Sequence, residues 1–231
     1  MAKKTKDTKK NKGKVFGKIV KIVLLAVVAC IIMFVAHTMR NYFILKNIAN
    51  KQKDLSYLTS YTIVREGYEK NELNVIIKTF RLKNKKVQIM VRAGYDVTIT
   101  AYTDLTTGEQ LSLFATTTTK QYQKGEANLN NLELSQFGRY ATWDARTLLA
   151  TAIHSIILSD TIDGKDCYKI MNSYGEGTYE YVEKSTGLEI RSKTTITDDE
   201  GKYSKLSYNF DKLDESIFEL PDLSQYEEIK K

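Results

Sequence analysis

The hydrophobic pattern divides the chain into one apolar run near its start and a longer region of short apolar segments separated by polar turns. Residues 22–39 contain no Lys, Arg, Asp or Glu. Extended back to Ile19, the run is long enough to cross a bilayer core of about 30 Å as a helix rising about 1.5 Å per residue. Because the backbone of an isolated apolar span must bond internally, the run predicts a transmembrane helix over residues 19–39.

Strand signals dominate the chain beyond a second helical stretch. Residues 40–55 lack Gly and Pro, which predicts a juxtamembrane helix. After it, segments rich in β-branched and aromatic residues are separated by polar turns at Asn84, Gly94 and Gly108. These turns are too short for crossover helices, so the strands are expected to pair antiparallel. The predicted strands cover residues 73–82, 87–92, 97–102, 111–119, 167–173, 178–183, 188–196 and 203–210.

One helix is predicted inside the strand region, over residues 143–157. Its apolar residues recur at the spacing of a single helical stripe. Thr142 is the expected N-cap, and Asp144 suits the first turn. A single stripe is expected to pack on one surface, here the sheet. The stripe consists of Ala145, Leu148, Leu149, Ala152, Ile153, Ile156 and Ile157.

Hairpin signals follow this helix at Gly164, Gly187 and Gly201, and the chain's only proline, Pro221, is expected to end the ordered part. The predicted organisation is a basic cytoplasmic tail (1–18), a membrane anchor (19–39), a juxtamembrane helix (40–55), a sheet domain (56–222) and a C-terminal tail (223–231). The fold class is α+β, with one or two helices packed on an antiparallel sheet.

Charge is concentrated at the N-terminus. The chain carries a formal net charge of +7, and residues 1–21 hold nine lysines against Asp7 alone. The remaining chain is nearly neutral, so a basic face for nucleic acid is not implied. The lysines precede the apolar run, which predicts a cytoplasmic N-terminus and a single-pass protein with an extracytoplasmic C-terminal domain. We interpret the tail as a solvated, disordered topology signal that also attracts anionic lipids.

Three other interpretations of the apolar run stay open. A cleaved signal peptide is disfavoured because bulky Phe34 precedes Ala36 at the best cleavage site. Residues 27–30 resemble a lipoprotein box, which makes Cys30 a candidate lipidation site, although residues 31–36 stay apolar. A buried core helix conflicts with the lysine block. Cys167 lies in the other part of the chain and is expected to be a buried small hydrophobe.

Catalytic and metal-binding motifs are absent from the sequence. It contains no H-E-x-x-H, G-x-S-x-G, Walker loop or C-x-x-C, and only two histidines, His37 and His154. The aspartates around Gly164 fit a hairpin better than a calcium loop, and the Gly-x-Gly at 175–177 fits a turn. We therefore predict a protein that is not an enzyme and needs no cofactor or metal. A hydrolase whose carboxylates converge on His154 is the remaining catalytic alternative.

The element order resembles the LolA-like family of lipoprotein carriers and its RseB-like relatives. Residues 179–191, YEYVEKSTGLEIR, resemble the family's segment of strand, acidic turn, Thr-Gly-Leu and next strand. Residues 208–210 and 215–222, YNF and ESIFELPD, resemble its closing segment. The resemblance extends over about residues 45–222. Members of the family are usually secreted or lipidated, whereas a helix anchors this chain.

The resemblance implies a strongly bent antiparallel half-barrel whose concave side shelters acyl chains. Burial of lipid area would contribute about 25 cal/mol per Å². The alternative is that the inserted helix fills the hollow and that the candidate lining residues form the core. The candidate lining residues are Ile76, Phe80, Met90, Tyr179, Tyr181, Leu206, Tyr208 and Phe210.

Two functions follow from this sequence. The first is a membrane-anchored extracytoplasmic protein that binds a lipid or another apolar molecule of the bacterial envelope on the concave face of the sheet. The second is an envelope interaction or regulatory protein with a filled interior, which contacts another protein through a sheet edge or its tyrosine-rich face. Neither involves nucleic acid.

Overall fold

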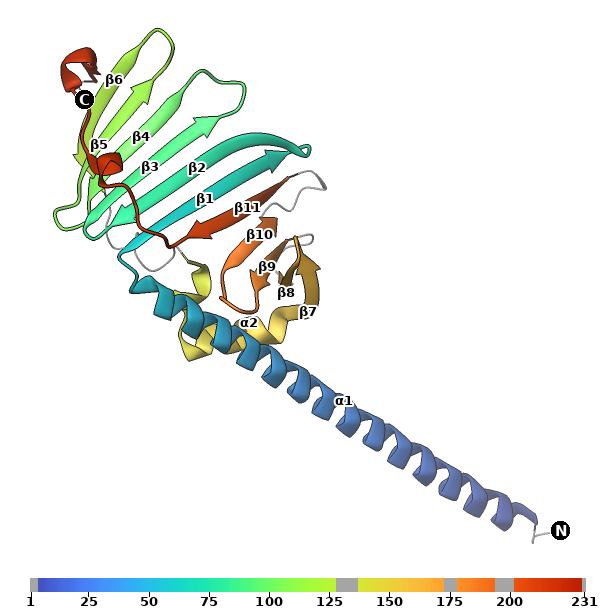
Figure 1. Cartoon of the computed structure of the whole chain (residues 1–231). Helices are drawn as coiled ribbons and strands as arrows, with labels where there is room; N and C mark the ends of the chain where they lie inside the picture. Colours follow the sequence, from blue (N-terminus) through green and yellow to red (C-terminus); the bar gives the residue numbers. More distant parts are fainter. Residues whose placement is uncertain (1–3, 128–136, 173–177, 194–201, 230–231) are drawn as a thin grey trace.

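The computed structural model describes residues 4–127, 137–172, 178–193 and 202–229. Within them, the chain forms one long helix, a second short helix and a twelve-stranded sheet (Figure 1). Helix α1 spans Lys4–Ser56 without a break, so the predicted anchor and juxtamembrane helix are one element. The lysine tail differs from the expected disordered signal because α1 begins at Lys4. Lysine is a good helix former, and no proline interrupts the tail.

The sheet is built from two meanders that meet in its middle. The strand order is β12-β6-β5-β4-β3-β2-β1-β11-β10-β9-β8-β7, and every described pairing is antiparallel except the parallel pair of β12 with β6. Neither edge strand pairs with the other, so the sheet is open. The strands are β1 (Ser60–Glu69), β2 (Glu72–Leu82), β3 (Lys85–Arg92), β4 (Thr98–Asp104), β5 (Glu109–Ala115), β6 (Lys120–Glu126), β7 (Ser155–Ile162), β8 (Lys165–Asn172), β9 (Tyr179–Glu183), β10 (Glu189–Lys193), β11 (Tyr203–Asn209) and β12 (Glu227–Glu228).

A connection between the two meanders carries the remaining helices. After β6 the chain reaches the 3-10 helix η2 (Arg139–Thr142) and then α2 (Ala145–His154), which leads into edge strand β7. Strands β8 to β10 return to the middle, where β11 pairs with β1. Figure 1 shows α1 and α2 beside the β7–β11 half, while β2–β6 extend away from the helices.

The two sides of the sheet have different neighbours. We call the side that α1 and α2 cover the helix face. Its main buried cluster comes from α1, η2, α2 and strands β7 to β9, and a second cluster lies over β1. The other side, which the C-terminal segment crosses, we call the strap face. The helix-face clusters contain Leu45, Ile48, Ala49, Tyr140, Leu148, Ala152, Ile157, Ile170 and Val182, and then Tyr61, Ile63, Phe137 and Leu188.

Two buried amides of α1 connect the helix to the sheet half. Asn41 Nδ2 donates to the carbonyl oxygens of Ala152 (3.2 Å) and Ser155 (2.8 Å). Gln52 Nε2 donates to Gly187 O (2.9 Å), and Gln52 Oε1 accepts from Ala141 N (3.2 Å). Both side chains are fully buried. They satisfy backbone groups that would otherwise be buried without partners.

A glycine lets the chain approach Gln52 this closely. Gly138 has φ 135°, and a Cβ atom there would lie 2.2 Å from Gln52 Nε2. Any other residue would be strained by the backbone angle and would also displace the amide.

The inserted helix is shorter than predicted. It ends at His154, so Ile156 and Ile157 belong to β7, and Leu149 and Ile153 are exposed and not packed on the sheet. Pairing of β7 with β8 outweighs the local helical spacing. The expected cap is also wrong: Asp144 is the N-cap and accepts from Thr147 N (2.8 Å), whereas Thr142 ends η2.

Most other elements agree with the sequence predictions. Gly94, Gly108, Gly164 and Gly187 have the positive φ angles that their turns need. Strands β1, β6, β7 and β12 were not predicted. Residues 223–231, expected as a tail, contain η4 (Leu223–Gln225) and β12. The predicted turns at 175–177 and Gly201, and the last residues of the 188–196 strand, lie outside the described residues.

We predict that Gln52→Ala destabilises the whole chain. The change leaves Gly187 O and Ala141 N buried without their partner, which costs roughly 2–4 kcal/mol. Urea unfolding of the full chain in detergent micelles measures the change. Lys53→Ala is the matched control, because its exposed side chain lies on the next position of α1. Equal stability of the two variants would contradict the role assigned to Gln52.

Candidate binding cleft

A cleft lies between the strap face of β3–β6 and the C-terminal segment. Strand register builds its floor from two rows of side chains. The first row runs from Val87 through Tyr102 and Leu111 to Lys124, one residue from each strand in turn. The second row contains Lys85 opposite Asp104 and Glu109 opposite Glu126. A row that is apolar from Val87 to Leu111 and ends in Lys124, which we call the apolar row, therefore lies beside a charged row at the turn end of these strands.

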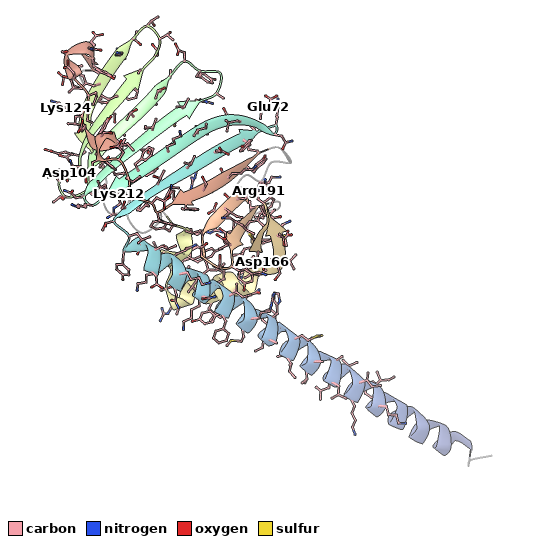
Figure 2. The ribbon with its side chains drawn as sticks, in the orientation of Figure 1. Glu72, Asp104, Lys124, Asp166, Arg191 and Lys212 are labelled. Carbon is pink, nitrogen blue, oxygen red and sulfur yellow. The ribbon has the colours of Figure 1, made fainter. Side chains whose placement is uncertain are left out.

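The cover of the cleft is residues 210–229, which we call the C-terminal strap. It contains the 3-10 helix η3 (Glu215–Phe218), η4 and β12. Phe218, Leu220 and Leu223 line the cleft from this side. Figure 2 shows Asp104 and Lys124 in the part of the sheet that the strap crosses. The strap thus adds three apolar side chains above the apolar row.

One set of contacts holds the strap on β6, and a second set shapes the strap itself. At its end, β12 pairs with β6, Ile229 N donates to Tyr122 O (2.9 Å) and Lys120 Nζ donates to Gln225 Oε1 (3.1 Å). Before that, Asp214 and Asp222 accept from the backbone amides of Ser216 (3.0 Å) and Ser224 (2.9 Å), which starts each 3-10 turn.

The cleft has a volume of about 990 Å³. That lies at the upper end of the range of roughly 300–1,000 Å³ that is usual for small-molecule sites. Apolar groups of Val87, Tyr102, Leu111, Phe218 and Leu220 face it from both sides. Charged side chains of both signs lie around them. Such a site suits a molecule with an apolar body and a polar or charged end.

Electrostatics at the cleft indicate packing and turn formation. Burial raises the pKa of Tyr102, and the nearby Tyr226 adds to the shift. Asp104 accepts from the backbone amides of Thr106 (2.7 Å) and Thr107 (3.2 Å), and these bonds lower its pKa. Burial, followed by the charge of Arg81, lowers the pKa of Lys86. Asp104 therefore stabilises the β4–β5 turn as a carboxylate and is a poor proton donor near neutral pH.

The predicted lining residues fall on both faces of the sheet and none lines this cleft. Ile76 and Phe80 of β2 lie on the strap face, and Phe80 is paired with Val87 of the cleft floor. Tyr179 and Tyr181 also lie on the strap face, in a cluster with Cys167 and Ile190 at the other half of the sheet. Cys167 is fully buried, as predicted.

The other predicted lining residues lie on the helix face. Met90 is paired with Ile77 on the uncovered part of that face. Leu206 and Tyr208 of β11 lie where β1 and Phe137 pack, and Tyr208 donates to Glu189 O (3.0 Å). The Phe210 ring lies near that of Phe137 in a tilted arrangement, with ring centroids 6.2 Å apart. Tyr208 is partly buried and packs against the cluster over β1.

Sequence reasoning missed the cleft because its residues come together through register and through the strap. The local signal was present in residues 215–222, where Phe218 and Leu220 alternate with acidic residues. Nothing in that segment indicates the strand face that it covers. Among the described residues, no group of three His, Cys, Asp or Glu side chains is placed to hold a metal ion. His154 ends α2 and does not line the cleft.

One buried carboxyl has an unusual environment, away from the cleft. Glu180 of β9 lies on the helix face, where Tyr140 Oη donates to its Oε1 and Arg139 donates from 2.8 Å. Burial raises its pKa to about 7, and the Arg139 charge opposes the shift. Perturbed carboxyls mark functional sites in many proteins. This one is enclosed beneath η2, so we interpret it as structural.

Comparison with known proteins adds no relative: no family model matches the chain and no curated protein matches it. The resemblance to LolA-like carriers therefore stays a prediction that depends on the residues quoted for it.

We predict that Glu180 makes stability fall as pH rises. The folded carboxyl keeps its proton up to about pH 7, whereas the ordinary value is 4.5. The folded state thus binds more protons between these values, and about 3 kcal/mol of stability is lost as pH rises from 4.5 to 7. Urea unfolding of the full chain across this range measures the slope. Glu180→Gln is expected to flatten it, and exposed Glu72→Gln to leave it unchanged. A slope that survives Glu180→Gln would contradict the assignment.

Proposed function

We propose that this chain is a membrane-anchored extracytoplasmic binding protein that holds a lipid or another apolar envelope molecule. The cleft under the C-terminal strap is the proposed site, in place of the residues first expected to line the sheet. The observation that carries the proposal is the apolar row of the floor facing Phe218, Leu220 and Leu223 across about 990 Å³. An apolar ligand that buried roughly 200 Å² there would gain about 5 kcal/mol.

The anchor supports this assignment. The described part of α1 contains one segment long and apolar enough to cross a membrane, with a mean hydropathy of 3.1, and none of that segment is buried in the protein. A soluble protein would expose this surface to water at a large cost. The lysine excess before it supports a cytoplasmic N-terminus, and with it the proposal that the cleft lies on the outer side. Cys30 is exposed within the span and is the candidate lipidation site.

The architecture is compatible with a LolA-like carrier. A mostly antiparallel, open sheet with α-helices on one face, and with no α-helix over β2–β6 in the described residues, fits the proposed half-barrel. Cleft binding differs from the carrier pattern in one respect. The strap, not the inserted helix, covers the apolar row.

An interaction protein is the second candidate, and one surface favours it. Tyrosines and cations alternate across the strap face of β8–β11 and β1. Tyr68 stacks on Tyr203 with ring centroids 4.8 Å apart, and Arg191 lies 4.9 Å from the Tyr203 ring. Lys169 lies 5.1 Å from the Tyr179 ring. Aromatic and cationic groups of this kind are enriched where proteins bind one another.

We predict that a photoactivatable fatty acid crosslinks to the cleft. The full chain in lipid nanodiscs would be labelled, and the crosslinked peptides mapped by mass spectrometry. Labelling of residues 218–223 and of β4 and β5 is expected, in addition to labelling of the anchor. Leu111→Lys should reduce cleft labelling about tenfold, because it brings a charge to the apolar row. Val91→Lys is the control, since Val91 is 42% exposed on the same face outside the cleft.

Labelling confined to residues 19–39 in every variant would contradict the binding proposal. If, in addition, a protein partner co-purified at stoichiometric amounts and was lost with Tyr203→Ala, the interaction function would be preferred.

A further inference from the structure

The sheet domain carries partly exposed apolar side chains at the junction of α2 with β7. Ile153 of α2 is 40% exposed, and Ile156 and Leu158 of β7 are 54% and 48% exposed. All three fall within a six-residue segment, 153–158, around the α2–β7 junction. We call these three residues the tip. A concentration of exposed aliphatic side chains marks a contact surface more often than chance.

Hydrogen bonds place the tip at the level where the membrane span ends. Asn41 Nδ2 donates to Ala152 O and Ser155 O, and Arg40 Nη1 donates to Ile157 O at 3.0 Å. The predicted span ends at residue 39, which precedes Arg40 by one residue, or about 1.5 Å along the axis of α1. The tip is therefore held beside the point at which α1 leaves the apolar layer.

The direction of α2 shows that the tip is the part of the domain nearest the span. The preceding η2 lies at the level of Gln52, which accepts from Ala141 N. The end of α2 lies at the level of Asn41, eleven residues earlier on α1. At about 1.5 Å per residue, α2 descends about 16 Å along α1 towards the span. Figure 1 shows α2 alongside this part of α1.

Side chains of α1 at the same level fit a membrane surface. Met39 and Phe43 are 43% and 59% exposed, and Tyr42 contacts Phe43 edge to face at 5.7 Å. Aromatic residues concentrate at the boundary between acyl chains and headgroups. Arg40 and Lys46 add two cations at this level, where anionic headgroups attract them.

We propose that the tip inserts into the interfacial layer of the outer leaflet, so that the domain rests on the bilayer at Ile153, Ile156 and Leu158. The proposed occupant of these positions is lipid, because the hydrogen bonds of Arg40 and Asn41 hold the α2–β7 junction beside the end of the predicted span. This inference rests on the proposed membrane anchor. It also fixes the orientation of the domain, since α1 and the tip give it two points of contact with one membrane.

Tryptophan quenching by spin-labelled lipids tests the proposal. The full chain is reconstituted in phosphatidylcholine–phosphatidylglycerol vesicles that carry a nitroxide either near the headgroup or near the acyl-chain end. Single tryptophans are placed on a Trp143→Phe background. Ile156→Trp reports the tip, Val27→Trp reports the span, and Tyr95→Trp, in the exposed β3–β4 turn, is the control. Thermal unfolding of each variant checks that it is folded.

The expected result is a blue-shifted Ile156→Trp emission that the headgroup-proximal nitroxide quenches most strongly. Val27→Trp should be quenched most strongly by the deep nitroxide, and Tyr95→Trp by neither. If Val27→Trp is quenched but Ile156→Trp behaves as Tyr95→Trp does, the tip proposal is overturned and the anchor stands. Emission from Ile156→Trp that is blue-shifted but insensitive to both nitroxides means a protein cover, such as a second copy on edge strand β7, and also overturns it. If Val27→Trp is not quenched, the anchor itself fails.

Discussion

The structure depends on buried hydrogen bonds between α1 and the second meander of the sheet. Asn41 and Gln52 lie on one side of the helix, three turns apart. Asn41 reaches backbone groups of α2 and β7, and Gln52 reaches backbone groups of η2 and the β9–β10 turn. Leu45, Ile48 and Ala49 fill the space between them with apolar contacts. Because an unpaired amide or carbonyl is costly in such a place, the helix has one register against the sheet. The part of α1 from Asn41 to Gln52 is thus a core element, not a stalk.

Because α1 packs mainly on the second meander, the two halves of the sheet differ in what covers them. Strands β7–β11 are covered by the helices on one face and hold the domain to α1. In the described part of the chain, strands β2–β6 carry no α-helix and project from that base, and the C-terminal strap with its 3-10 helices crosses them at the end remote from the N-terminus (Figure 1). The cleft therefore lies at the end of the sheet that is remote from the N-terminus. Under the proposed anchorage, a ligand there would be held away from the bilayer.

Local sequence patterns were sufficient for elements whose neighbours follow directly in the chain. Strand β2 was placed within one residue, and its turn to β3 needs only polar residues and a positive φ at Lys83. The span and its continuation to Ser56 were equally accessible, because the apolar run and the lack of breakers are local properties. Strand β7 was not, since Ile153, Ile156 and Ile157 have helical spacing and only pairing with β8 decides against it.

The candidate site also depends on contacts between strands that local sequence patterns do not specify. Tyr102 and Leu111 form one row only when the register of β4 and β5 is known, and a shift of one residue would reverse their faces. Phe218 and Leu220 meet that row across about a hundred residues of sequence. Met90 of β3 and Ile76 of β2 lie on opposite faces because Met90 pairs with Ile77 and not with Ile76. Alternation within one strand does not reveal this pairing.

Hydrogen exchange of the full chain in nanodiscs tests the central claim that residues 41–52 of α1 and the β7–β9 sheet form one cooperative core. The account predicts that amides in both segments exchange only through the same global opening, with the same dependence on urea, and that Gln52→Ala speeds both together. If residues 41–52 exchanged through local fraying while β7–β9 stayed protected, the helix would be a separable stalk and the account would be contradicted.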